Sequence, residues 1–146
     1  GMLSVKRELL LRGIRSVDMP GKFFDFDLYT NNNIRIEVKS ASERQDEVFK
    51  NGANYLQNSW TFNNVKSIKR ENQFYSEAIN GKECDFYVLV CFNNDITRVE
   101  RFYILPCGLV NHESKLIRVN KTKAEFDSKS KYTPYQDKWD LLVKNK

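Results

Sequence analysis

Four charged residues occupy alternate positions on two stretches in which polar and apolar side chains alternate. Asp25 and Asp27 lie on the first stretch, and Glu37 and Lys39 lie on the second. Because residues two apart in a β-strand share a face, we expect the acids and the lysine to meet on one face of a strand pair. Carboxylates that crowd together repel one another unless a cation lies between them. Mg²⁺ suits such a site, because it binds few carboxylates together with water and phosphate oxygens.

Lys39 places a positive charge beside the predicted ion. There it could hold or deprotonate a water molecule and offset charge that develops on a phosphate group. An alternative interpretation is an exposed hairpin face with cross-strand charge pairs, each worth less than ~1 kcal/mol. Two further acid-x-Lys triplets, residues 113–115 and 127–129, follow no acidic strand, so the context of Glu37 and Lys39 distinguishes them.

Residues 24–30 and 34–40 are predicted to form the β-hairpin that positions these side chains. Phe26 and Leu28 alternate with the acids, and Ile36 and Val38 alternate with the polar residues of the second strand. One face of each strand is therefore apolar and is expected to face the core. The three asparagines at 31–33 predict a tight turn, since asparagine tolerates positive φ better than most residues.

Residues 26–40 resemble the core of the PD-(D/E)XK nuclease superfamily, and most resemble its small stand-alone endonuclease-like members. In those proteins a hydrophobic-Asp-Leu strand, here Phe26-Asp27-Leu28, precedes a strand of the form Ile/Val-Glu/Gln-Val-Lys-Ser/Thr, here residues 36–40. Similar features cover most of the chain. They are an acid on the opening helix (Glu8), a Trp-x-Phe stretch (beginning at Trp60), an aspartate leading a central strand (Asp85), an aromatic strand ending in proline (Pro106), and a Trp-Asp-Leu-Leu tail (beginning at Trp139).

The resemblance implies that Asp27 and Glu37 bind Mg²⁺, for which Mn²⁺ can substitute, with help from the backbone carbonyl of Val38. Lys39 would assist the attacking water in phosphodiester hydrolysis, and Glu8 would be a supplementary acid near the metal. No proline directly precedes Asp27, and Asp25 is an extra acid, so both aspartates are candidates for the main ligand. We favour Asp27, because it precedes leucine as in the family and lies closer to the turn.

The remaining sequence predicts an α/β architecture. Residues 84–92 form an apolar run without alternation, which is typical of a central strand covered on both faces, whereas residues 41–58 show no assignable pattern. Other predicted elements are a helix at 3–10 ending before Gly13, strands at 14–17, 59–63, 99–105 and 116–119, and a helix at 65–79. We therefore expect one domain, residues 1–146, folded as a restriction-endonuclease-like three-layer sandwich in which helices flank a central mixed β-sheet.

Charge and cysteine content narrow the class of protein. The net charge of +5 and a pI near 9.1 suit a polyanionic partner, and we expect nucleic acid, in particular DNA. No apolar run approaches the ~20 residues of a membrane span, so no membrane contact is expected.

The cysteines do not suit a zinc site. Cys84 and Cys91 are seven apart on one predicted strand and would point to opposite faces, which argues against zinc binding together with Cys107 and His112. An odd cysteine count without framework spacing predicts a reduced compartment, and we expect a cytoplasmic protein.

Together these patterns predict an enzyme, a Mg²⁺-dependent endonuclease that hydrolyses phosphodiester bonds of DNA. A second hypothesis is a catalytically inactive module of the same fold that binds nucleic acid or regulates a partner. A third is an unrelated protein whose hairpin happens to be charged. A homodimer would suit double-strand cutting, although no interface stripe is readable in the sequence.

Overall fold

The computed structural model describes residues 1–20, 26–63, 65–70, 73–78, 84–110, 116–121 and 131–144. Along the chain they form α1 (Met2–Leu11), β1 (Ser16–Asp18), β2 (Leu28–Thr30), β3 (Arg35–Ser42), β4 (Arg44–Lys50), β5 (Ala53–Asn63), β6 (Val65–Arg70), β7 (Gln73–Ala78), β8 (Phe86–Phe92), β9 (Val99–Pro106), the 3₁₀ helix η1 (Cys107–Leu109), β10 (Leu116–Asn120), the 3₁₀ helix η3 (Thr133–Tyr135) and α2 (Asp140–Lys144). None of the described helices has the length and apolar character needed to cross a membrane.

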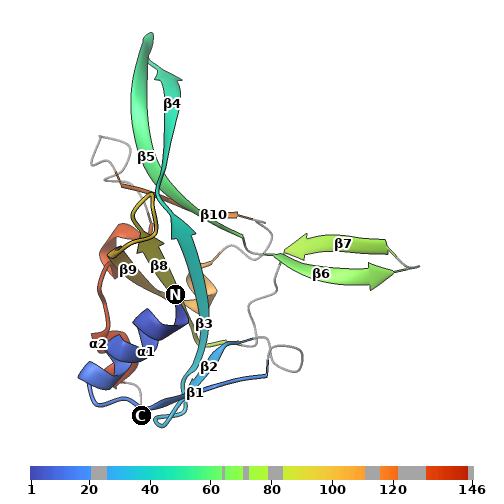
Figure 1. The fold of residues 1–146 in the computed structure, drawn as a ribbon, viewed down its shortest axis with the longest axis vertical. Helices are drawn as coiled ribbons and strands as arrows, with labels where there is room; N and C mark the ends of the chain where they lie inside the picture. The colour runs from blue at the N-terminus through green and yellow to red at the C-terminus, as the bar shows by residue number, and fades with distance from the viewer. Residues whose placement is uncertain are drawn as a thin grey trace.

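A five-stranded sheet with the order β1-β2-β3-β8-β9 forms the centre of the body (Figure 1). β3 and β8 run parallel, from the pair Ile36 and Phe86 to the pair Ser42 and Phe92, and the other neighbours are antiparallel. The predicted mixed sheet is therefore confirmed. The predicted β-hairpin is confirmed as well: β2 and β3 pair across the asparagine turn, where Asn33 adopts φ of 66°.

β8 is buried along its length, as its unbroken apolar run predicted. Tyr87, Leu89 and Cys91 enter one core, and Val88 and Val90 enter another on the opposite face. We call the first the strand-side core, since its other members include Trp60, Phe62, Ile117 and Val119 of β5 and β10. We call the second the helix-side core, since its other members include Val5, Leu9, Ile36 and Leu142.

Helices cover one face of the central sheet. Val5 and Leu9 of α1, four apart on one helical face, are fully buried, and Leu142 of α2 joins them in the helix-side core. α1 ends where Gly13 takes φ of +77°, a conformation that glycine adopts without strain, so the predicted helix and its end are confirmed. On the opposite face the described residues show β5 and β10 rather than a second layer of helices.

β4 and β5 form a long hairpin in the stretch that the sequence left unassigned, and they project from the body (Figure 1). The turn is Asn51-Gly52, with φ of 54° and 77°, the backbone conformation in which such dipeptides close two-residue hairpins. The base of β5 contains the predicted strand 59–63, where Trp60 and Phe62 are buried. β10 pairs with this base and completes a three-stranded sheet of order β10-β5-β4.

The helix predicted over residues 65–79 is wrong. β6 and β7 form an antiparallel hairpin there, with register from Val65 opposite Ala78 to Arg70 opposite Gln73. β-branched and aromatic residues such as Ile68 and Tyr75, which are paired in this register, have low helix propensity and favour strands.

Candidate active site

The chain bends at Asp27, directly before β2, where its backbone N–H still donates to the Ile36 carbonyl of β3. Phe26 belongs to the strand-side core and Leu28 to the helix-side core, so the expectation that both face the same core is wrong. The last β2–β3 pair is Leu28 with Ile36. Beyond that pair, the next hydrogen bond from β3 goes to the Asp27 side chain: Oδ2 of Asp27 accepts a hydrogen bond of 2.8 Å from the Val38 backbone N–H. A side-chain oxygen thus replaces the backbone acceptor that a continuing strand would supply.

Glu37 and Lys39 flank Val38 and share the face of β3 toward the strand-side core. Glu37 is in register with Tyr87, a fully buried member of that core, and its charge acts on the Tyr87 hydroxyl and the Cys84 thiol. Lys39, two residues on, lines a hollow with Ala41. The structure therefore brings Glu37 and Lys39 to one face of β3. The Asp27 carboxylate contacts Val38, the residue between them, through its hydrogen bond.

Buried tyrosine and cysteine side chains lie near Glu37. Burial raises the pKa of Tyr87 above its ordinary value, and the negative charges of Cys84, Cys107 and Glu37 would raise it further. Burial likewise raises the pKa of Cys84, whose thiol contacts that of Cys107. Tyr87 and Cys84 therefore stay neutral at neutral pH.

The backbone of Val38 offers a third oxygen. In a strand the N–H and C=O of one residue point to the same edge. The Val38 N–H points to Asp27, so its carbonyl points to the same edge, past the last β2–β3 pair. No described group donates a hydrogen bond to this carbonyl. A carbonyl oxygen at this edge is a suitable hard ligand.

Two carboxylates and a carbonyl fit Mg²⁺ better than zinc. Among the described residues no group of three His, Cys, Asp or Glu side chains is close enough to hold a metal. Mg²⁺ retains several waters and is commonly bound through one or two carboxylates plus phosphate oxygens. A four-coordinate structural zinc site needs nitrogen or sulfur ligands that converge. Asp27, Glu37 and the Val38 carbonyl therefore match the donor set of Mg²⁺ or Mn²⁺.

None of the described cysteines forms a disulfide, and no three described His, Cys, Asp or Glu side chains are grouped so that they could hold a metal. The expectation that Cys84 and Cys91 point to opposite faces is wrong, since both belong to the strand-side core. Cys84 precedes the first residue of β8 and so does not follow the alternation of that strand. His112 lies outside the described residues.

The structure does not bring Glu8 to the other three site residues. Its carboxylate accepts a 2.7 Å hydrogen bond from Arg12, one turn further along α1. Glu8 lines a hollow with Phe102 and Trp139, on the side of the sheet that α1 covers. Glu37 faces the other core. Glu8 matches the family only in being an acid on the opening helix, and the sequence carries no signal for which way that helix turns it.

Asp85 has a structural role and Asp25 lies outside the described residues. The Asp85 carboxylate accepts hydrogen bonds from the Arg35 backbone N–H at 2.8 Å and from the guanidinium at 3.2 and 3.3 Å. Burial disfavours its charge, but the hydrogen bonds and charge of Arg35 outweigh burial, and the pKa of Asp85 lies below its ordinary value. Asp85 therefore joins the start of β3 to the start of β8 rather than binding metal.

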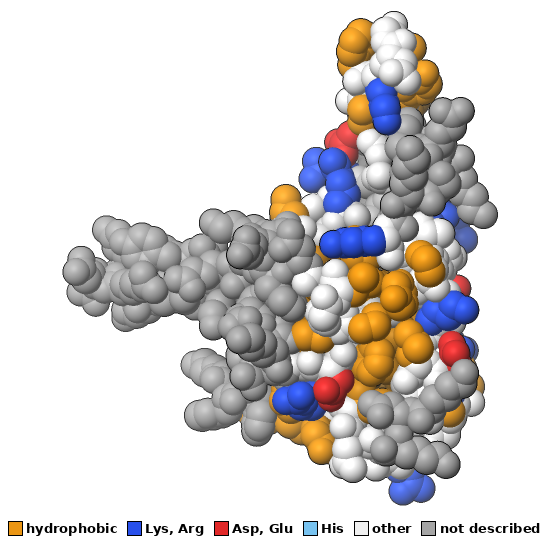
Figure 2. All heavy atoms as spheres, turned by 180° about the vertical axis from the view of Figure 1, so that it is seen from behind, with side chains coloured by type: hydrophobic (Ala, Val, Ile, Leu, Met, Phe, Trp, Pro, Cys, Tyr) orange, Lys and Arg blue, Asp and Glu red, His pale blue; other side chains and the backbone are white. Residues whose placement is uncertain are grey.

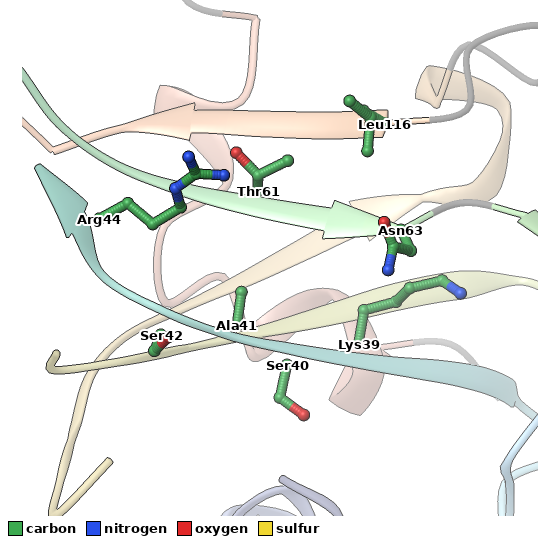
Figure 3. A pocket seen from close by; sticks show the side chains of 8 residues that line it. All are labelled: Lys39, Ser40, Ala41, Ser42, Arg44, Thr61, Asn63 and Leu116. Atoms are coloured by element: carbon green, nitrogen blue, oxygen red, sulfur yellow. The ribbon is translucent and has the colours of Figure 1, made fainter. Parts of the chain in front are cut away.

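Lys39 opens onto a hollow of about 500 Å³ between β3 and the base of the β4–β5 hairpin (Figure 3). We call it the Lys39 groove; its walls include Lys39, Ala41, Arg44, Thr61, Asn63 and Leu116. Within the part of the chain that the structure describes, Lys39 forms no ion pair. The groove was not predicted: strands at 59–63 and 116–119 were expected, but the sequence does not show that Thr61, Asn63 and Leu116 lie opposite β3.

No protein-family model matches the chain, and no curated protein matches it. Among solved structures, a bacterial homing endonuclease, I-Ssp6803I, has a similar fold with a TM-score of 0.67. The match covers 97% of this chain and 86% of that one, at 17% sequence identity. At this identity the likeness concerns the fold. The chain therefore has a mixed α/β fold that it shares with an endonuclease.

Proposed function

We propose that this protein is a metal-dependent nuclease of the PD-(D/E)XK type that hydrolyses phosphodiester bonds of DNA. The observation that carries the proposal is the hydrogen bond from the Val38 N–H to Asp27, because it holds a carboxylate at the strand edge next to Glu37 and Lys39. The fold shared with a homing endonuclease and the net charge of +5 support a nucleic-acid substrate.

Each site residue would have a separate role in hydrolysis. Asp27, Glu37 and the Val38 carbonyl would hold Mg²⁺, which lowers the pKa of a bound water and offsets charge on phosphate oxygens. Asp27 is positioned by its hydrogen bond, so its carboxylate needs little reorganisation to bind. Lys39 has no ion pair with a described residue, so its ammonium is available to orient the attacking water and to neutralise charge on the phosphate.

Cleavage of supercoiled plasmid DNA tests the proposal. We expect nicking or cutting with Mg²⁺ or Mn²⁺ and none with EDTA. Lys39→Ala and Asp27→Ala should each slow cleavage at least ~100-fold, in line with the loss of one charge-stabilising group at an active site. Lys138→Ala is the matched control, because it removes the same charge at an exposed position away from β3. Cleavage that survives both site substitutions would contradict the mechanism, and DNA binding without cutting would favour an inactive module.

A further inference from the structure

The Lys39 groove carries positive charge at both ends and neutral hydrogen-bonding groups between them. Lys39 lies at one end and Arg44 at the other, and the side chains of Thr61 and Asn63 lie on the wall opposite β3 (Figure 3). No described acidic residue lines the groove. Such a lining suits the phosphates and sugars of a nucleic-acid backbone, because arginine, lysine, threonine and asparagine side chains commonly contact them.

Arg44 is available to an anion. Its side chain is 61% exposed, and its ion pair with Asp46 is long, at 3.6 Å. Asp46 also pairs with Arg118 of β10 at 3.5 Å, so one carboxylate is shared between two arginines. Exposed ion pairs of this kind contribute well under about 1 kcal/mol. A phosphate can therefore replace Asp46 as the partner of Arg44 at little cost.

The groove is built on strands that are fixed before any ligand binds. Its β3 wall is paired to β8 along residues 36–42, and its β5 wall is paired to both β4 and β10. The face in Figure 2 shows several Lys and Arg side chains where the projecting hairpin joins the body, with one acidic side chain beside them. A preformed positive channel at this junction favours a rigid polyanion.

We infer that the Lys39 groove binds the sugar-phosphate backbone of the DNA strand next to the bond that is cut, with Arg44 on a neighbouring phosphate and Thr61 beside it. This inference rests on the proposed function, because it takes Lys39 as the end at which cleavage occurs. Contacts of this type fix the register of the strand on the protein and carry no sequence information.

DNA affinity as a function of salt tests the inference. Fluorescence anisotropy with a short mixed-sequence duplex in EDTA measures binding without cleavage. Arg44→Gln should weaken binding about 3- to 10-fold and make the slope of log affinity against log salt shallower by about one, as expected for one lost phosphate contact. Thr61→Glu, which adds a negative charge inside the groove, should weaken binding by at least as much. Circular dichroism melting of both variants establishes that they fold.

Arg98→Gln is the matched control. Arg98, like Arg44, is exposed (72%) and pairs at 3.5 Å with an acid two residues further on, but it lies away from the groove on the β8–β9 turn. Arg98→Gln should leave the DNA affinity and its salt dependence unchanged.

Equal effects of Arg44→Gln and Arg98→Gln would overturn the inference. If the wild type cuts DNA but Arg44→Gln binds normally, the groove inference fails and the nuclease proposal stands. If the wild type binds but never cuts, and Arg44→Gln binds weakly, the nuclease proposal fails and the binding groove stands.

Discussion

Substitutions of Asp27 separate its role as a metal ligand from its role as a hydrogen-bond acceptor. Asp27→Asn keeps an oxygen that can accept the Val38 N–H and removes the charge, whereas Asp27→Ala removes both. A hydrogen bond to a charged acceptor contributes about 1.5–3 kcal/mol when buried, and Asp27 is only half-buried. We therefore expect Asp27→Ala to lower the free energy of unfolding by about 1–2 kcal/mol. Asp27→Asn should change it by less than about 1 kcal/mol, because the amide oxygen can still accept the Val38 N–H.

Calorimetry with and without metal is the assay. A ligand at ten times its Kd stabilises the folded state by about 1.4 kcal/mol. In a chain of this size that corresponds to a rise in Tm of about 3–5 °C. Mg²⁺ or Mn²⁺ should raise the Tm of the wild type by this amount and leave both Asp27 variants unchanged.

Asp18→Asn is the control for loss of a surface charge. Asp18 is 61% exposed and, among the described residues, forms an ion pair with Lys6, so this variant should keep the full metal response. The reasoning would be refuted if Asp27→Asn kept the metal-dependent rise in Tm. It would also be refuted if Asn and Ala destabilised the metal-free protein equally, since Asp27 would then act only as a charged cap of Val38.

Two further predictions concern ion pairs that hold the fold. The pKa of Asp85 is lowered, so its contribution to stability is complete above the ordinary carboxyl pKa of 3.8 and is lost as pH falls below it. Urea unfolding should therefore show a stability difference between wild type and Asp85→Asn that is constant near neutral pH and shrinks in acid; a constant difference down to low pH would contradict this. Lys121 bridges Glu43, at 2.9 Å, and Glu100, at 2.6 Å, and both carboxylates have side chains only 13% exposed. Lys121→Met should cost about 1–2 kcal/mol at neutral pH and much less once the carboxylates are protonated, and an unchanged urea midpoint at neutral pH would contradict it.

The parts of the fold that could be predicted from sequence are those in which burial repeats with a regular period. β8 could be recognised because both of its faces are buried, which leaves an unbroken apolar run. The β2–β3 hairpin could be recognised because its apolar and charged residues alternate around an asparagine turn. In both cases the core determines the pattern, so the pattern identifies the element.

Elements with solvent on both faces could not be predicted in this way. β4 and the outer half of β5 project from the body, so no core imposes alternation on them. The missing signal was local: Asn51-Gly52 is the dipeptide most typical of a two-residue hairpin turn, and it lies midway between the two strands. The β6–β7 hairpin was mistaken for a helix, although its β-branched and aromatic residues, such as Ile68 and Tyr75, favour strands.

The candidate site was predictable in composition and less so in geometry. Glu37 and Lys39 share a face because both belong to one regular strand. Asp27 was expected on that face, but β2 begins only at Leu28, and the carboxylate of Asp27 instead accepts a hydrogen bond from the backbone N–H of Val38. Glu8 is directed elsewhere by the packing of α1, which depends on Val5 and Leu9 rather than on the acid. The Lys39 groove needs three parts of the sequence, residues 39–44, residues 61–63 and Leu116, and only their tertiary arrangement reveals it.

Anomalous scattering from crystals soaked in Mn²⁺ tests the central claim most directly. We predict a single strong peak within coordination distance of a carboxylate oxygen of Asp27, a carboxylate oxygen of Glu37 and the carbonyl oxygen of Val38, at about 2.0–2.2 Å for a small hard cation. The peak should disappear in crystals of Asp27→Asn. A soaked crystal of the wild type with no manganese between Asp27 and Glu37 would contradict the proposed metal site.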